Sequence, residues 1–343
     1  MSLEQEKERW ARRAVTVPGV VALWLVMLAT LPALFAVALV VDLARPRSFA
    51  AVRVVGALFV VVTLHVVGLA ILLRAWVGGL LRGRAYERRL DGAAELWFAA
   101  TVWSSAIRIF GMRVEVEGAE VLDRRGPAVV MTRHASLLDV LLPLVTVCAP
   151  AELVPHIVAK RELLWDPCVD LVGHRVASAF VHRGGRDRAG DLARVAAVAR
   201  ACGRHDALVL FPEGTRFSDE RRAKRLAELA ADPAAHERAL RLEHVLPPRL
   251  GGPLATLEAA PPADVIFCAH TGLERARTLG DLLSGALVGE TVRVHLWRVR
   301  ARDVPTSREE RIEWLWRWWE HVDAWITRTG AAPPPSRSAP GEA

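Results

Sequence analysis

Two long apolar runs near the start of the 343-residue chain restrict its architecture more than any other feature. Residues 20–41 and residues 54–73 contain no charged side chain. A helix over the first run would be about 33 Å long at about 1.5 Å per residue, close to the thickness of the hydrocarbon core of a bilayer. A charge at the centre of that core costs roughly 3 kcal/mol or more, and both runs avoid it. We therefore expect a membrane hairpin of two hydrophobic helices within residues 1–84.

Several arrangements of this hairpin fit the sequence. Pro32 and the glycines of the second run permit a re-entrant or shallow hairpin as well as a complete crossing, and a hairpin buried in a protein core would also be apolar. A cleaved signal peptide fits poorly, because the first run is too long and a second follows it. Lys and Arg are more numerous outside the hairpin than in its connecting loop. This distribution favours a hairpin with both ends on the cytoplasmic side, so we expect residues 85–330 on the cytoplasmic side of the cell (inner) membrane.

Net charge and cysteine content limit the binding partners and the cellular compartment that we expect for this chain. The formal net charge is +7, which suits anionic lipid surfaces, phosphate groups or nucleic acid, and no nucleic-acid-binding motif supports the third option. The four cysteines are scattered without zinc-ligand spacing or a disulfide framework, so we expect buried thiols in a reducing compartment. Residues 331–343 are rich in Pro and Ala and cannot bury a core, which predicts a disordered tail.

Beyond the hairpin, short apolar runs alternate with stretches of helical periodicity. The first of these stretches predicts a helix over residues 85–110 that ends at Gly111. This alternation is typical of an α/β fold in which helices cover a layered sheet, and we assign it to residues 85–330. Strands are expected at residues 113–117, 128–131, 156–159, 177–181, 207–211, 265–269 and 292–299, and further helices at 136–147, 187–201, 219–231 and 306–328.

A histidine and a carboxylate five residues apart form the first candidate site. His134 follows the strand at 128–131, and Asp139 would lie about one turn into the next helix. With an ordinary pKa of about 6.5, an imidazole can take a proton from an alcohol at neutral pH. The carboxylate would orient the ring and stabilise the imidazolium. Taken alone, this spacing is weak evidence for a catalytic site, because a Ser136 that caps a helix and a solvent-exposed Asp139 would have the same sequence.

Residues 211–216 read F-P-E-G-T-R and add a second site. Gly214 allows close backbone approach in the turn that follows the strand at 207–211. Thr215 offers a hydroxyl group, and Arg216 offers a fork of donors suited to a phosphate monoester. Glu213 could brace Arg216 or the amides of the turn. A plain surface turn is the alternative, but together the two strings indicate acyl transfer to an alcohol that carries phosphate.

These strings resemble the signatures of the 1-acylglycerol-3-phosphate acyltransferases, within the wider lysophospholipid acyltransferase family. His134 and Asp139 match the H-x4-D signature of the family, and residues 211–216 match its F-P-E-G-T-R signature. Three further segments fall at matching places: A-K-R-E-L at 159–163, F-V-H-R at 180–183 and V-L-P-P at 245–248. The resemblance covers roughly residues 95–328. One departure is Arg133, where many members have Asn, and this cation could alter the phosphate contacts or the surroundings of the histidine.

The resemblance implies a reaction and a set of residues. His134 would act as general base and Asp139 would orient it, moving an acyl group from acyl-CoA or acyl-carrier protein to lysophosphatidic acid or a related lysophospholipid. Neither an acyl-enzyme nor a metal or cofactor is expected. The implied substrate-binding residues are Lys160, Arg183, Glu213, Gly214, Thr215 and Arg216.

Three other functions stay open on the sequence alone. The acceptor could be a lipid without phosphate, or the same base could activate water and release fatty acid. The chain could also be a catalytically silent membrane protein that binds anionic lipid, although the intact pair of His134 and Asp139 argues against it.

Overall fold

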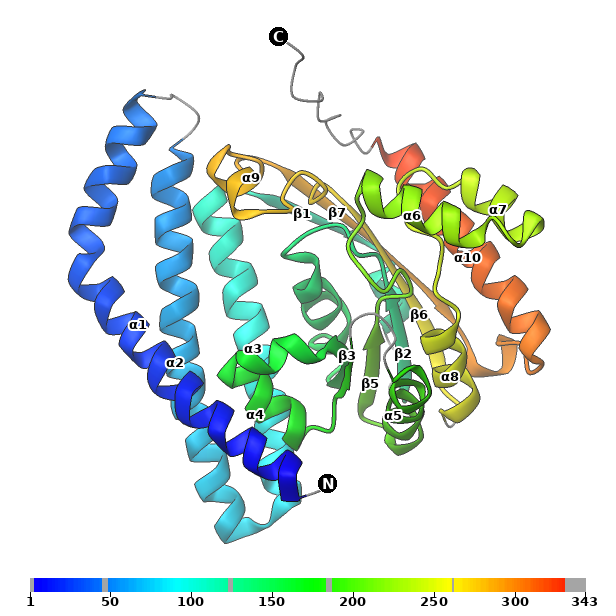
Figure 1. The fold of residues 1–343 in the computed structure, drawn as a ribbon, viewed down its shortest axis with the longest axis horizontal. Coiled ribbons are helices and arrows are strands. Elements are labelled where there is room, and N and C mark those ends of the chain that lie inside the picture. Colours follow the sequence, from blue (N-terminus) through cyan, green and yellow to red (C-terminus); the bar gives the residue numbers. More distant parts are fainter. Residues whose placement is uncertain (1–2, 45–48, 123–125, 183–186, 261, 331–343) are drawn as a thin grey trace.

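The computed structural model describes residues 3–44, 49–122, 126–182, 187–260 and 262–330. The tail predicted at 331–343 and the predicted ligand Arg183 lie outside these residues. Three long helices stand beside a seven-stranded sheet that carries helices on both faces (Figure 1). The α/β fold and the hydrophobic hairpin expected from the sequence are both confirmed.

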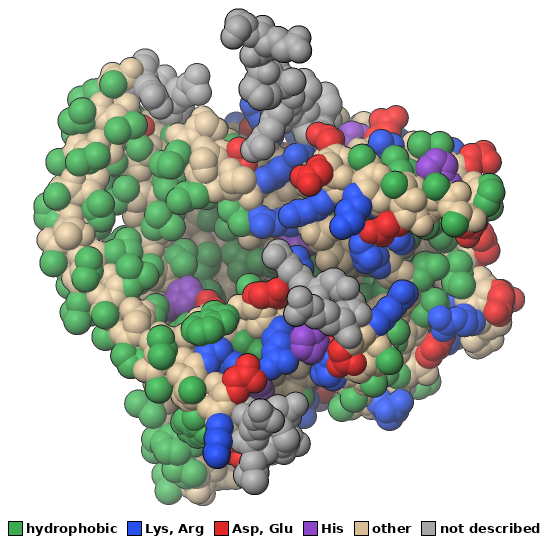
Figure 2. All heavy atoms as spheres, in the orientation of Figure 1, with side chains coloured by type: hydrophobic (Ala, Val, Ile, Leu, Met, Phe, Trp, Pro, Cys, Tyr) green, Lys and Arg blue, Asp and Glu red, His purple; other side chains and the backbone are tan. Residues whose placement is uncertain are grey.

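The hairpin consists of α1 (Leu3–Ala44) and α2 (Ala50–Arg82). By length and composition both helices could cross a membrane. The most apolar part of α1 is not buried at all inside the protein, so burial in a protein core is wrong for this helix. Figure 2 shows the apolar side chains that cover this side of the molecule. Apolar surface of this extent favours association with lipid. The most exposed large side chains of α1 include Leu25, Val26, Val37, Val40 and Leu43.

Helix α3 (Arg84–Phe110) joins the hairpin to the sheet. The break between α2 and α3 falls at Gly83, whose φ of 89° is a conformation that favours glycine. As predicted, α3 ends at Gly111, where a φ of 68° lets the amide cap the carbonyl of Ile107. Val54 of α2 packs in the same core cluster as Phe110 of α3. The hairpin is therefore continuous with the core under the sheet.

The strands are ordered β1-β7-β6-β2-β5-β3-β4, and only the β6–β7 pair is antiparallel. Every predicted strand is present, with ends shifted by up to two residues. Because β2, β5, β3 and β4 run parallel, the residues that follow them gather at one edge of the sheet. The strands are β1 (Arg113–Glu117), β2 (Ala128–Thr132), β3 (Val154–Lys160), β4 (Ala179–Val181), β5 (Asp206–Leu210), β6 (Asp264–Thr271) and β7 (Thr291–Val299).

Alternate side chains of the central strands face two separate cores, as the pleat of a strand requires. Val130 of β2 packs toward α3, whereas Val129 and Met131 pack toward α8 and α10. The predicted helices at 187–201, 219–231 and 306–328 are α5, α6 and α10; α4, α7, α8 and α9 were not predicted. The helices beyond α3 are α4 (Pro167–Arg175), α5 (Arg188–Ala201), α6 (Asp219–Leu229), α7 (Pro233–Leu240), α8 (Gly251–Ala259), α9 (Leu279–Leu283) and α10 (Arg308–Thr329).

The helix predicted at 136–147 is present, but it begins three residues later than expected and runs over Asp139–Cys148. The chain stays irregular through Leu138, then forms a short 3-10 turn (Asp139–Leu141) and a π-helical turn (Leu144–Cys148). The later start is due to Asp139, whose carboxylate accepts hydrogen bonds from the amides of Ala135 and Ser136 and holds the residues before it in a loop. Ser136 donates its hydroxyl to the carbonyl of Ala276 instead of capping a helix start.

Candidate functional site

His134 and Asp139 meet at the carboxyl end of β2. The Nδ1 atom of His134 lies 3.0 Å from Oδ1 of Asp139. Asp139 is fully buried, while the His134 side chain keeps 15% of its surface exposed. The His134 ring also packs against Phe211, with 4.5 Å between ring centroids. With Nδ1 engaged by the carboxylate, Nε2 is the ring atom left to meet a substrate.

Four groups surround the buried carboxylate of Asp139. Besides His134, its oxygens accept hydrogen bonds from the amides of Ala135 and Ser136, the latter at 2.7 Å, and Nε2 of His270 lies 3.6 Å from Oδ2. Burial by itself would raise the pKa of Asp139, but the hydrogen bonds and charges of His134 and His270 hold that pKa far below its usual value. The group is therefore a carboxylate at neutral pH.

The predicted turn at residues 211–216 follows β5, and Gly214 has a φ of 68°. A Cβ atom there would lie 2.8 Å from Cδ of Arg249, so both the backbone and the space require glycine. Thr215 and Arg216 are half-buried beside it. The Nη1 atom of Arg216 donates to the carbonyl of Arg277 at 2.9 Å, which leaves its other donors available.

Glu213 was expected to brace Arg216 or the amides of its own turn, but it accepts hydrogen bonds from the amides of two other segments. Its carboxylate accepts from the amide of His134 at 2.7 Å and from that of Leu246 at 2.8 Å. Only 1% of Glu213 is exposed, and burial raises its pKa to about 8. The amide of Phe217 also donates to the carbonyl of His134 at 2.7 Å. The turn and the histidine loop are thus fixed to each other.

Arg133 does not reach the phosphate side of the site. It is 1% exposed, forms an ion pair with Glu274, and donates to the carbonyls of His270 and His244 at 2.6 and 2.9 Å. The expected effect on phosphate contacts is therefore wrong. Through these hydrogen bonds the guanidinium connects the loop that carries His134 to β6 and to the segment before α8.

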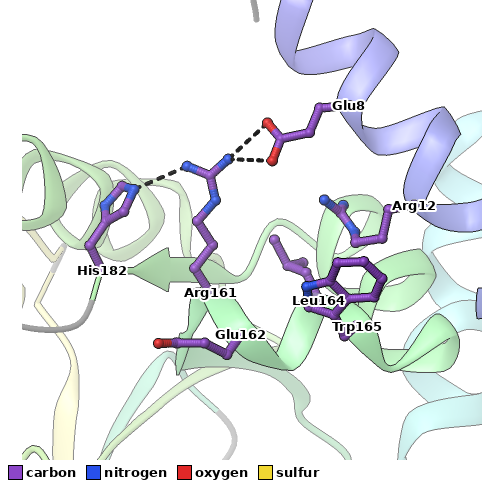
Figure 3. Close-up of a pocket in the computed structure, with 7 residues that line it drawn as sticks. All are labelled: Glu8, Arg12, Arg161, Glu162, Leu164, Trp165 and His182. Carbon is purple, nitrogen blue, oxygen red and sulfur yellow. Dashed lines mark hydrogen bonds and ion pairs between the residues drawn. The ribbon is translucent and has the colours of Figure 1, made fainter.

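Lys160 ends β3 and is half-buried. The next residue, Arg161, lines a pocket of about 420 Å³ between the foot of α1 and the ends of β3 and β4. Figure 3 shows its guanidinium between Glu8, at 3.1 and 3.2 Å, and Nε2 of His182, at 3.0 Å. The pocket is completed by Arg12, Glu162, Leu164 and Trp165.

One group in the described part of the chain has metal-ligand geometry. His182, Asp187 and Asp191 bring one ligand atom each within 4.8 Å of one another. Arg194, however, already pairs with both carboxylates, at 3.0 Å from Asp187 and more closely to Asp191. Arg161 also contacts His182. The arginines supply the positive charge that a metal would bring, so the group is an ion-pair network.

His270 is the member of the site that sequence reasoning missed. It is fully buried near the end of β6, and its Nε2 atom faces both Asp139 and the carbonyl of Arg133. The sequence did contain one indication: His270 directly follows the apolar run at 265–269, and a polar side chain buried at the end of such a run needs a hydrogen-bond partner. The partner itself is 131 positions away in sequence and could not be identified.

Comparison with known proteins gives consistent matches. Residues 113–247, which include both signatures, match the model of the Acyltransferase family. The chain is 40% identical over 110 residues to the 1-acyl-sn-glycerol-3-phosphate acyltransferase alpha proteins of Homo sapiens, Ovis aries and Bos taurus. That alignment covers 32% of this chain and 36% of each relative, so the chain spans about a third of their length.

A solved structure resembles most of the chain. The 1-acyl-sn-glycerophosphate (LPA) acyltransferase PlsC from Thermotoga maritima superposes with a TM-score of 0.56. The superposition covers 84% of this chain and 99% of that one, at 17% sequence identity. The shared architecture therefore extends beyond the segment that the family model matches.

Proposed function

We propose that this chain acylates the free hydroxyl of lysophosphatidic acid or a related lysophospholipid, because residues 113–247 match the Acyltransferase family model and the matching relatives are 1-acyl-sn-glycerol-3-phosphate acyltransferases. The observation that carries the proposal is the contact between His134 and Asp139 beside the turn at 211–216. A base, its orienting acid and an arginine for phosphate thereby share one edge of the sheet.

In the proposed reaction, Nε2 of His134 accepts the proton of the acceptor hydroxyl as its oxygen attacks the thioester carbonyl of the donor. The tetrahedral intermediate then collapses, the carbon–sulfur bond breaks, and the imidazolium returns its proton to the departing thiolate. Asp139 is charged throughout and stabilises the imidazolium. A positioned general base of this kind contributes roughly 10²- to 10⁴-fold to the rate. The transfer is direct, without a covalent acyl-enzyme, metal or cofactor.

We assign the acceptor phosphate to Arg216, assisted by Lys160 and Arg183. Arg216 uses one donor on the carbonyl of Arg277, and its remaining donors suit phosphate oxygens. Gly214 and Thr215 bring the turn backbone and a hydroxyl close to the same place. Holding the phosphate in this way positions the hydroxyl before attack, which lowers the entropic part of the barrier.

The donor in this proposal is acyl-CoA or acyl-carrier protein, and the acceptor arrives from a membrane. The exposed apolar faces of α1 and α2 support lipid association. We place the α/β part on the cytoplasmic side of the inner membrane, following the distribution of Lys and Arg around the hairpin.

An acceptor comparison with the full chain in lipid nanodiscs tests this assignment. The wild-type protein is expected to acylate lysophosphatidic acid, and Arg216→Ala should raise KM for that acceptor while KM for the donor stays unchanged. A matched variant, Arg204→Ala, removes an exposed arginine before β5 at the opposite edge and should behave like wild type. Transfer to a phosphate-free lysolipid only, or release of free fatty acid only, would contradict the proposed acceptor.

A further inference from the structure

A second pocket lies behind the turn at 211–216, on the side of α6. Its volume is about 190 Å³. That space fits a phosphate or diphosphate group. Glu213, Thr215 and Leu246 form its wall toward the site. The remaining lining residues are Arg221, Lys224, Arg225, Glu228 and Arg249.

The basic side chains that line this pocket outnumber its acidic side chains. Glu228 pairs with Arg225 at 3.0 Å and with Arg249 at 3.4 Å. Glu213 commits its oxygens to the amides of His134 and Leu246. Lys224 is exposed and has no side-chain partner among the residues that the structure describes. Figure 2 shows Lys and Arg side chains gathered over α6 and the neighbouring turn.

Arg225 reinforces this imbalance. Its Nε atom is buried and has no hydrogen-bond partner in the described structure. Burial, and then the nearby charge of Arg249, lower the pKa of the Arg225 guanidinium. Buried donors without partners are uncommon in native proteins, and they mark places where an acceptor binds or a water sits. Three arginines and a lysine around one small cavity favour an anionic group.

The pocket adjoins the place that we assign to the acceptor phosphate, because Thr215 stands between the two. Arg221 donates to the carbonyl of Arg216 at 2.9 Å, so it stands behind the backbone of the turn. The guanidinium of Arg216 instead reaches the carbonyl of Arg277. Arg216 does not line the pocket. A second phosphate-bearing molecule could therefore bind while the acceptor is in place.

The pocket also lies one side chain away from the predicted base. Glu213 lines the cavity and accepts the amide hydrogen of His134 at 2.7 Å. A CoA thioester carries its phosphates at one end of a flexible pantetheine arm and the reacting carbonyl at the other. A phosphate site near His134, but not in contact with its ring, fits that layout.

We propose that the pocket formed by Arg221, Lys224, Arg225 and Arg249 binds the nucleotide phosphates of acyl-CoA. This inference rests on the proposed acyltransferase function and names the donor of the same site. Binding there places the thioester near His134 while Arg216 holds the acceptor phosphate, so that both substrates are held at once.

A donor comparison tests the inference with the full chain in nanodiscs. Lys224→Gln/Arg249→Gln removes two exposed pocket cations, and Arg204→Gln/Arg302→Gln removes two exposed cations at the opposite sheet edge. The pocket variant should raise KM for acyl-CoA about tenfold or more, as expected for losing two charge-assisted contacts. Its turnover of acyl-pantetheine, which has no phosphate, should match wild type. The control variant should leave both donors unchanged.

The outcomes separate this inference from the proposed function. If wild type transfers acyl groups but the pocket variant keeps its KM for acyl-CoA, the pocket assignment is overturned and the function stands. The assignment also fails if KM rises only for lysophosphatidic acid, or only for acyl-carrier protein. If wild type transfers from no donor to any lysophospholipid, the proposed function itself has failed.

Discussion

Replacing Asp139 with asparagine removes one negative charge from the site and keeps almost the same shape. The Asn oxygen can still accept from the amides of Ala135 and Ser136, which Asp139 holds in the native protein. The amide nitrogen then faces Nδ1 of His134 and favours the tautomer that carries hydrogen on Nε2. That tautomer cannot accept the proton of a substrate hydroxyl. We expect kcat to fall by roughly four orders of magnitude, as in other His–Asp pairs.

The effect on stability should be much smaller than the effect on rate. The charged hydrogen bond to His134 and the weaker contact with His270 are lost, and a hydrogen bond to a charged group contributes about 1.5–3 kcal/mol. The pKa of Asp139 is lowered in the folded protein, so its stabilisation exists above the ordinary carboxyl value and is lost as pH falls through the folded value. Asparagine avoids the larger cost of Asp139→Ala, which would leave two buried amides unpaired.

The assay measures transfer of labelled acyl groups from acyl-CoA to lysophosphatidic acid over a range of both substrates. Thermal unfolding by circular dichroism shows whether the variant is folded. A folded Asp139→Asn protein that keeps its kcat within about tenfold of wild type would refute the assigned roles of His134 and Asp139, because a tautomer-setting carboxylate is worth far more.

Two other changes test the turn that follows β5. Gly214→Ala should lower the free energy of unfolding by about 1–2 kcal/mol, since it places a Cβ at positive φ and against Arg249; equal denaturant midpoints would contradict this strain. Burial raises the pKa of Glu213 to about 8, so the wild-type free energy of unfolding should decline as pH rises from about 5 to about 8. Glu213→Gln should flatten that part of the pH profile, and an unchanged slope would exclude Glu213 as its source.

The sequence predicted the strands and the outer helices because their apolar patterns are local. β2 and β5 are buried throughout, and four consecutive residues of each are apolar. The sequence also predicted that His134 and the turn at 211–216 act together, since both come directly after such strands. The order of strands in the sheet did not follow, because it depends on pairings between segments far apart in the chain.

Errors arose where tertiary contacts override local preference. The periodicity of residues 136–147 predicted a helix that starts at residue 136, yet the buried Asp139 takes the amides of Ala135 and Ser136 and the helix starts only at Asp139. The cation of Arg133 was expected to alter the phosphate contacts or the surroundings of His134, but its ion pair with Glu274 holds it in the interior. The contact of His270 with Asp139 joins residues with no sequence relation.

The measurement that tests the central claim most directly is acyl transfer by a folded His134→Gln variant. Purified in nanodiscs, this variant should show thermal unfolding and lipid association like wild type, yet no detectable transfer from acyl-CoA to lysophosphatidic acid at any pH. Lys7→Gln, a change far from the histidine loop in sequence, serves as the matched control and should retain full activity. Turnover by His134→Gln close to that of wild type would show that another group removes the hydroxyl proton.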